Sequence, residues 1–228
     1  MVTTKRKPDF KRQMYEKEAW ERSELVCGID EVGRSCFAGP VVAAAAILRP
    51  KAKFKYLKDS KQLTPEQREL AYAWLLKNST FAVGIVHHRI IDSINIYQAT
   101  LCAMKRALVQ LLAHAPTHPS VILVDAMPVK LDHMDIPVVS FCFGERQSAS
   151  IAAASIIAKV TRDRLMTRLD PVIPGYVFTN NKGYGTLAHR NGIKEQGLCL
   201  MHRMSFVGKS ADEVQDLPVD ENMTFFEL

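Results

Sequence analysis

The stretch that decides the fold is CGIDEVGRSCFAGP, residues 27–40. An apolar run leads into two adjacent carboxylates, Asp30 and Glu31, and a Gly-Arg-Ser turn and a second apolar run follow them. Carboxylates at the end of a buried strand cost free energy unless a partner compensates their charge, and a divalent metal is the usual partner. Arg34, which lies among small residues beside this pair, indicates a substrate that carries phosphate.

The apolar patterns along the chain predict an α/β fold with a mixed sheet of five strands flanked by helices. We expect helices after a Thr64 N-cap with a capping box, from about Asn95, and over 148–169. The first three strands are joined by short links and are expected to be antiparallel. The expected strands are residues 25–31, 39–48, 81–87, 121–125 and 137–143.

Three of these apolar strands end in acids: Asp30 with Glu31, then Asp125, then Glu145. Acids at the ends of separate strands converge at one edge of a sheet, where open α/β sheets place their sites. Four carboxylates close together repel one another, so they call for Mg²⁺ or Mn²⁺, which prefer oxygen ligands. Two such ions about 4 Å apart would hold the attacking and leaving oxygens of a displacement at phosphorus.

Each acid also has an ordinary structural interpretation. A single acid after a strand is usually a turn residue, which is the alternative for Asp125. Glu145 could simply precede a helix N-terminus. Asp163 lies four residues after Lys159 and is expected in an ion pair on a helix surface. The prediction of a metal site therefore depends on the four acids together.

Composition indicates one domain with tails: a charged N-terminal arm or helix over 1–24, a catalytic domain over 25–206 and an acidic tail over 207–228. The formal net charge of +6 suits a polyanionic partner, although the excess is modest. The five cysteines have no metal-binding spacing and suit a reduced, cytoplasmic protein. No stretch has the length of a membrane span. We expect a monomer.

With these residues in view, the sequence resembles bacterial ribonuclease HII, the type 2 ribonuclease H family. The resemblance implies a ribonuclease H-like fold with a C-terminal helical and loop extension. It also implies metal-dependent cleavage of the RNA strand of RNA–DNA hybrids and incision at single ribonucleotides in duplex DNA, which leaves 3′-hydroxyl and 5′-phosphate ends. Besides the opening stretch, the motifs that carry it are DSKQL (59–63), VDA (124–126), IAAASIIAKVTRD (151–163), NKGYGT (181–186) and HRMSF (202–206).

By this resemblance, Asp30, Glu31 and Asp125 match three of the family's four metal-binding acids, and Glu145 stands where the fourth is found. The segment 33–35 matches a glycine–basic–glycine loop whose backbone recognises the ribose 2′-hydroxyl. Two further residues have matches in the family. Tyr184 matches a tyrosine that packs on the sugar at the RNA–DNA junction, and Lys61 matches a basic residue near the phosphates.

Two positions depart from the family pattern. Glu145 replaces the aspartate of a Lys-Gly-Asp triplet, and its extra methylene would displace the second metal, lower activity or favour Mn²⁺. Ser35 replaces a glycine. If that position needs a positive φ, serine costs about 1 kcal/mol. The serine Cβ would also crowd the groove that receives the ribose and weaken selectivity for a single-ribonucleotide junction.

Three other functions remain open: a ribonuclease HIII-like enzyme, another nuclease of the same fold, and a hybrid-binding protein with weakened catalysis. The C-terminal tail also suggests a partner. Residues 222–226 (NMTFF) resemble peptides that bind bacterial sliding clamps. The alternative, that the two phenylalanines pack on the protein's own core, is the favoured interpretation of this segment.

Overall fold

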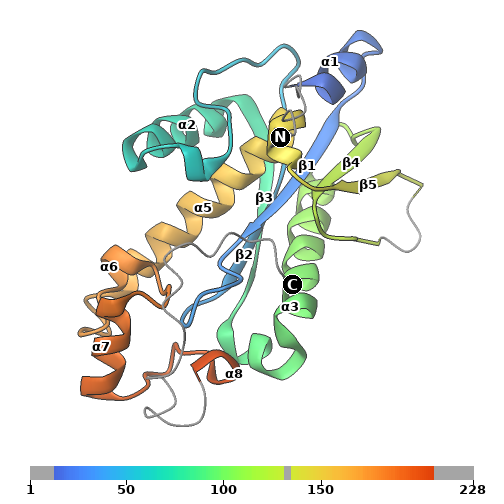
Figure 1. Ribbon diagram of the computed structural model, residues 1–228. Helices are drawn as coiled ribbons and strands as arrows, with labels where there is room; N and C mark the ends of the chain where they lie inside the picture. The colour runs from blue at the N-terminus through green and yellow to red at the C-terminus, as the bar shows by residue number, and fades with distance from the viewer. Residues whose placement is uncertain (1–12, 131–134, 208–228) are drawn as a thin grey trace, which may run out of the picture.

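The computed structural model describes residues 13–130 and 135–207, and it contains the expected five-stranded mixed sheet (Figure 1). The strand order is β3-β2-β1-β4-β5. The first three strands in sequence pair antiparallel, whereas β4 is parallel to β1 and β5 is parallel to β4. The strands are β1 (Val26–Val32), β2 (Val41–Leu48), β3 (Ser79–Val86), β4 (Val121–Asp125) and β5 (Val138–Phe141).

Helices cover both faces of the sheet (Figure 1). Helix α3 (His88–His114) packs on one face, and α5 (Ala149–Leu169) with α2 (Pro65–Asn78) packs on the other. Strand β2 is buried along its whole length, because its odd-numbered side chains face α3 and its even-numbered ones face α5. Its four central residues are alanines, which let both helices approach closely.

The start of α5 lies directly against β1. A Cβ on Gly28 would come within 2.1 Å of the backbone of Ser150, so only glycine fits there. Helix α1 (Met14–Glu21) reinforces this junction through the buried Glu16. The Glu16 carboxylate accepts hydrogen bonds from the Ser148 hydroxyl at 2.6 Å and the Ser150 N–H at 2.9 Å. It thereby caps α5 beside the strand that carries Asp30 and Glu31.

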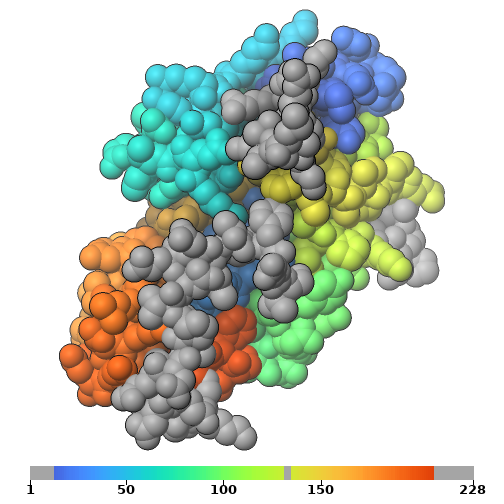
Figure 2. All heavy atoms as spheres, viewed as in Figure 1, coloured from blue at the N-terminus to red at the C-terminus, as the bar shows by residue number. Residues whose placement is uncertain are grey.

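The remaining elements are short, and three of them form the expected C-terminal extension. Figure 2 shows the orange and red residues of that extension at one end of the molecule and the cyan residues before and within α2 at the other. Within the part of the chain that the structure describes, no helix combines the length and apolarity needed to cross a membrane. The short elements are η1 (Ser60–Gln62), α4 (Gly144–Gln147), α6 (Phe178–Asn181), α7 (Leu187–Gln196) and α8 (Met204–Val207).

Local signals located the helix starts well where a cap was present. The Thr64 capping box is formed in both directions, and Ser148 caps α5 through the Ile151 N–H. The helix expected from Asn95 does begin there, because Asn95 has a non-helical φ of 67° and its Oδ1 accepts a 3.0 Å hydrogen bond from the Gln98 N–H, as an N-cap does. A preceding helical stretch from His88 makes α3 longer than expected. The clamp-like segment 222–226 and most of the expected acidic tail lie outside the described residues.

Candidate active site

Strand register brings the first three acids together. In the parallel pair of β1 and β4, Ile29 lies opposite Val124, so Asp30 and Asp125 follow side by side at the same edge of the sheet. Successive residues of a strand face opposite sides. Asp30 accordingly faces α5, where burial raises its pKa and a hydrogen bond from Ser155 partly offsets that rise, whereas the carboxylate of Glu31 lies 3.6 Å from Arg34 Nη1.

Glu145 joins this cluster from a different element than expected. The prediction that it ends the fifth strand is wrong, because β5 stops at Phe141 and Phe143 adopts a left-handed conformation with φ 61°. That turn starts α4, which carries Glu145 in its first turn. The Gly144 N–H donates a 2.9 Å hydrogen bond to Asp125 Oδ1, and this bond couples α4 to the end of β4.

The electrostatics of the four acids show that they interact. Burial is the main cause that raises the pKa of each, and for Glu31 the pKa reaches about 7. Repulsion from Glu31 and Asp125 raises the pKa of Asp30 further, and repulsion from Asp125 does the same for Glu145. The site is therefore an acid cluster whose charged forms need a cation nearby.

A fifth acid, Asp59, belongs to the same neighbourhood. Its charge raises the pKa of both Asp125 and Glu145, after the larger effect of burial. Asp59 Oδ1 also accepts a 2.9 Å hydrogen bond from the Lys61 N–H at the start of η1. From the DSKQL motif (59–63), only the lysine was predicted to belong to the site. The signal that could have identified Asp59 is its position two residues before that lysine.

The donor set fits a divalent cation, although the side chains need to turn to hold one. In residues 13–130 and 135–207, no three His, Cys, Asp or Glu side chains have metal-binding geometry as they stand. Glu31 Oε2 is nevertheless buried with no hydrogen-bond partner in that part of the chain. Glu31 Oε1 lies 3.6 Å from Arg34 Nη1 and Glu145 Oε1 lies 3.9 Å from Arg146 Nε, so both carboxylates would have to turn from these arginines to bind a cation through oxygen.

The loop at residues 33–35 is held from beneath by a buried arginine. Arg203 is fully buried and donates to the carbonyls of Gly33 at 2.6 Å, Arg34 at 2.8 Å and Gly39 at 2.9 Å. Its burial lowers its pKa to about 10. Gly33 has φ 90°, and a Cβ there would lie 2.2 Å from Arg162 Nε. Gly33 takes the left-handed position in this loop, whereas Ser35 does not have a positive φ, so the backbone strain expected at Ser35 is absent.

Tyr184 lies beside the same loop. The fully buried Arg162 donates to the carbonyls of Ala38, Pro40 and Lys182, so it joins the segment that follows residues 33–35 to the segment that precedes Tyr184. The Arg162 guanidinium lies 5.8 Å from the centre of the tyrosine ring. Burial raises the pKa of Tyr184, which keeps its hydroxyl neutral. Sequence reasoning gave no role to Arg162 or Arg203, although both stand in quoted motifs.

Two lysines lie near these residues, Lys61 beside the acids and Lys159 beside the Tyr184 ring. Lys61 is exposed, and its charge partly offsets the rise that burial causes in the pKa of Glu31 and of Asp125, so it lies near the acids. Lys159 Nζ forms the expected ion pair with Asp163 Oδ1, at 2.9 Å, but both side chains are only 17% exposed, so the pair is half-buried rather than fully on the helix surface.

Comparison with known proteins identifies the family. The family model for ribonuclease HII matches residues 27–209. A ribonuclease HII of Levilactobacillus brevis is 46% identical over 197 residues, which cover 86% of this chain and 74% of that protein. A ribonuclease HII of Listeria monocytogenes is 43% identical over 217 residues, covering 90% of this chain and 80% of that one.

Solved structures show the same fold. The ribonuclease H2 of Pyrococcus horikoshii aligns with a TM-score of 0.64 at 25% identity and covers 84% of this chain and 97% of its own. A Bst ribonuclease HIII in complex with Mn²⁺ aligns with a TM-score of 0.65 at 22% identity, over 85% of this chain and 70% of that one. Archaeoglobus fulgidus ribonuclease HII, solved in complex with PCNA, aligns with a TM-score of 0.63 at 24% identity. The alignment covers 82% of this chain and 99% of that one.

Proposed function

This chain belongs to the ribonuclease HII family of ribonuclease H endonucleases, and we propose that it hydrolyses the RNA strand of RNA–DNA hybrids and incises at single ribonucleotides in duplex DNA. Cleavage leaves 3′-hydroxyl and 5′-phosphate ends. The observation that carries the proposal is the cluster of Asp30, Glu31, Asp125 and Glu145, whose mutual repulsion and burial suit bound divalent ions. The same four residues are the proposed metal ligands.

The ions in this proposal are two Mg²⁺ or Mn²⁺, which supply an activated water and stabilise the charge that develops on the phosphate. The chain's own residues prepare the site for them. Asp30 and Asp125 are placed by strand register, and the Gly144 N–H orients the Asp125 carboxylate. Lys61, whose charge acts on Glu31 and Asp125, is the proposed contact to a phosphate oxygen beside these acids.

Selectivity for ribose is assigned to the loop at 33–35 and to Tyr184. Arg203 holds the carbonyls of Gly33 and Arg34 inward, which leaves the remaining backbone groups of the loop to meet a 2′-hydroxyl. Arg34 is partly exposed and can turn from Glu31 to a substrate phosphate. Tyr184 would pack on the sugar beside it.

Cleavage-site mapping tests the proposal on two labelled duplexes, one with a single ribonucleotide and one with a long RNA stretch, in Mg²⁺ and in Mn²⁺. We expect incision of both substrates. Asp30→Asn should lower the rate at least ~1,000-fold, since a metal ligand acts on the transition state. Asp135→Asn is the matched control, because Asp135 is an exposed acid that precedes β5, at the other end of that strand from the acid cluster, and it should retain most activity.

The same experiment separates the competing functions. Tight hybrid binding without metal-dependent cleavage would instead identify a hybrid-binding protein. Cleavage of long hybrids but not of the single-ribonucleotide duplex would favour a ribonuclease HIII-like specificity. Cleavage of DNA or RNA duplexes at equal rates would identify another nuclease of this fold.

Location and partners are part of the same proposal. All five cysteines are free, which suits the reducing cytoplasm, and a monomer is expected. The Archaeoglobus fulgidus relative was solved with PCNA, and residues 222–226 are the candidate clamp-binding segment here. Deleting 222–228 should abolish binding to a bacterial sliding clamp and leave cleavage unchanged. Undiminished clamp binding would remove this idea.

A further inference from the structure

A basic loop after β2, residues 49–58, lies beside Glu145 and has no part in the site described above. These residues (RPKAKFKYLK) contain five basic residues and no acid, a local charge of +5 in a chain whose net charge is +6. Lys51, Lys53 and Lys55 are exposed, whereas the residues between and after them are half-buried or buried. None of these three lysines forms an ion pair within residues 13–130 and 135–207.

The loop is held in one conformation by its alternate residues. Phe54 stacks on Trp74 of α2, with ring centres 5.1 Å apart and planes at 7°, and Leu57 enters the core beneath it. Gln13 Nε2 donates a 3.2 Å hydrogen bond to the Ala52 carbonyl from the other side. Because the aromatic side chains face inward, the lysines are left pointing outward along a fixed backbone.

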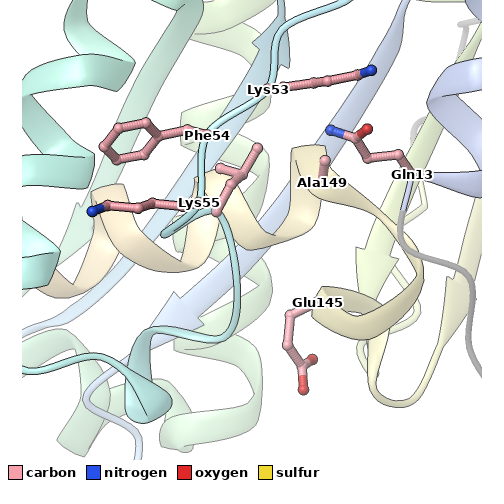
Figure 3. A pocket seen from close by; sticks show the side chains of 7 residues that line it. Gln13, Lys53, Phe54, Lys55, Glu145 and Ala149 are labelled. Carbon is pink, nitrogen blue, oxygen red and sulfur yellow. The ribbon is translucent and has the colours of Figure 1, made fainter.

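Between this loop and the start of α5 lies a pocket of about 400 Å³ that reaches Glu145 (Figure 3). Lys53 and Gln13 point toward one another across it, and Lys55 extends from the other side of the loop. Glu145 lines the edge of the pocket from α4. Ala149 lines the floor at the first turn of α5. Glu16 already neutralises that helix end, so attraction for an anion comes from the lysines.

We propose that this pocket is a phosphate-binding subsite for the nucleic acid strand next to the scissile phosphate, with Lys53 and Gln13 as its contacts and Lys55 binding the adjacent phosphate. The proposal rests on the proposed function and extends it to a loop that no catalytic role explains. Glu145 belongs both to the acid cluster and to the lining of this pocket. A nucleic acid strand that runs from the acid cluster past Glu145 would therefore enter the pocket that Lys53 lines.

The test is hybrid binding measured by fluorescence anisotropy as a function of salt, in the Asp30→Asn background so that the substrate stays intact. Neutralising two phosphate contacts should reduce the salt slope of log K by about 2 and weaken binding about tenfold at low salt. We expect this of the double substitution Lys53→Gln with Lys55→Gln. The matched control is Lys77→Gln with Lys105→Gln, two exposed helix lysines whose loss gives the same net charge. It should leave the slope unchanged.

Two further arms identify the ligand. Lys53→Arg with Lys55→Arg should restore the slope, and shortening the duplex on one side of the cleavage position should erase the difference from wild type. Equal slopes for the Gln variant and the control would overturn the proposal. So would a free 5′-mononucleotide that binds with the same lysine dependence as the hybrid, which would instead assign a nucleotide site. Failure of the parent protein to bind or cleave any hybrid would count against the proposed function itself.

Discussion

The two sides of the acid cluster are built in opposite ways. On one side, the loop at 33–35 and the segment before Tyr184 are tied by the buried Arg203 and Arg162, which together donate six hydrogen bonds to backbone carbonyls. On the other side, Glu145 stands on the four-residue helix α4 after the four-residue strand β5, whose side chains are exposed or half-buried.

We call the side with the loop at 33–35 and Tyr184 the rigid side, and the side with α4 and Glu145 the adjustable side. The two sides differ in how firmly hydrogen bonds hold them. Charge-assisted hydrogen bonds from a buried guanidinium define one geometry and are costly to lose. A short helix whose only described anchor to the other acids is the bond from Gly144 to Asp125 can shift by a few tenths of an ångström at little cost. We therefore expect ribose selectivity to depend on the first side and metal preference on the second.

The largest expected effect comes from loosening the rigid side. Arg203→Lys retains a charge but loses at least two of three hydrogen bonds, so the free energy of unfolding should fall by roughly 2–4 kcal/mol. Urea unfolding measures this. Arg164→Lys is the control, because Arg164 pairs with Glu69 on the surface, and it should cost less than about 1 kcal/mol. Equal losses would contradict the assigned role of Arg203.

A second effect on the rigid side depends on pH. His189 and His202 are buried and touch through their Nε2 atoms at 3.1 Å. Burial, followed by the charge of His189, lowers the pKa of His202 to about 4 from 6.5. His202 therefore binds a proton more strongly in the unfolded state than in the folded state. As the pH falls from 6.5 to 4, roughly 2–3 kcal/mol of the free energy of unfolding should be lost.

Urea unfolding at several pH values checks the contribution of this histidine pair. His202→Gln should be less stable at pH 7 but should lose less stability on acidification than wild type does. If both proteins lose the same free energy between pH 6.5 and pH 4, the pair does not cause the acid sensitivity.

A smaller effect is expected on the adjustable side. Glu145→Asp shortens the side chain by a methylene and should raise the rate in Mg²⁺ up to about tenfold while changing the rate in Mn²⁺ little, because Mg²⁺ is stricter in geometry. Single-turnover cleavage in each metal measures the ratio. Glu145→Gln, which removes the charge, should slow both reactions. Equal rates of wild type and Glu145→Asp in both metals would refute the effect of side-chain length.

The smallest expected effect concerns Ser35, where crowding by the Cβ remains after backbone strain is excluded. Ser35→Gly should raise the ratio of single-ribonucleotide to long-hybrid cleavage a few-fold, with stability lowered by no more than about 1 kcal/mol through added backbone freedom. Ser35→Ala keeps the Cβ and should leave the ratio unchanged. A ratio that rises equally in both variants would point to the hydroxyl instead.

Much of the fold was predictable because its signals are local. The capping box at Thr64 and the N-cap at Ser148 need only neighbouring residues, and the alternation of β2 follows from the two-residue period of a strand. The convergence of Asp30 and Asp125 also followed from apolar strands that end in acids. The element that carries Glu145 could not be predicted, because a left-handed Phe143 has no local signature.

By itself, the sequence determined where the strands lie along the chain, the family and the four acids first assigned to the cluster, since each depends on patterns within a short window. Only the tertiary structure decided which groups hold these residues in place. The bond from Arg203 to the Gly33 carbonyl joins positions 170 residues apart, and Glu16 reaches Ser150 across 134. Such contacts depend on how the helices and the sheet pack together, and no local pattern of side chains encodes that.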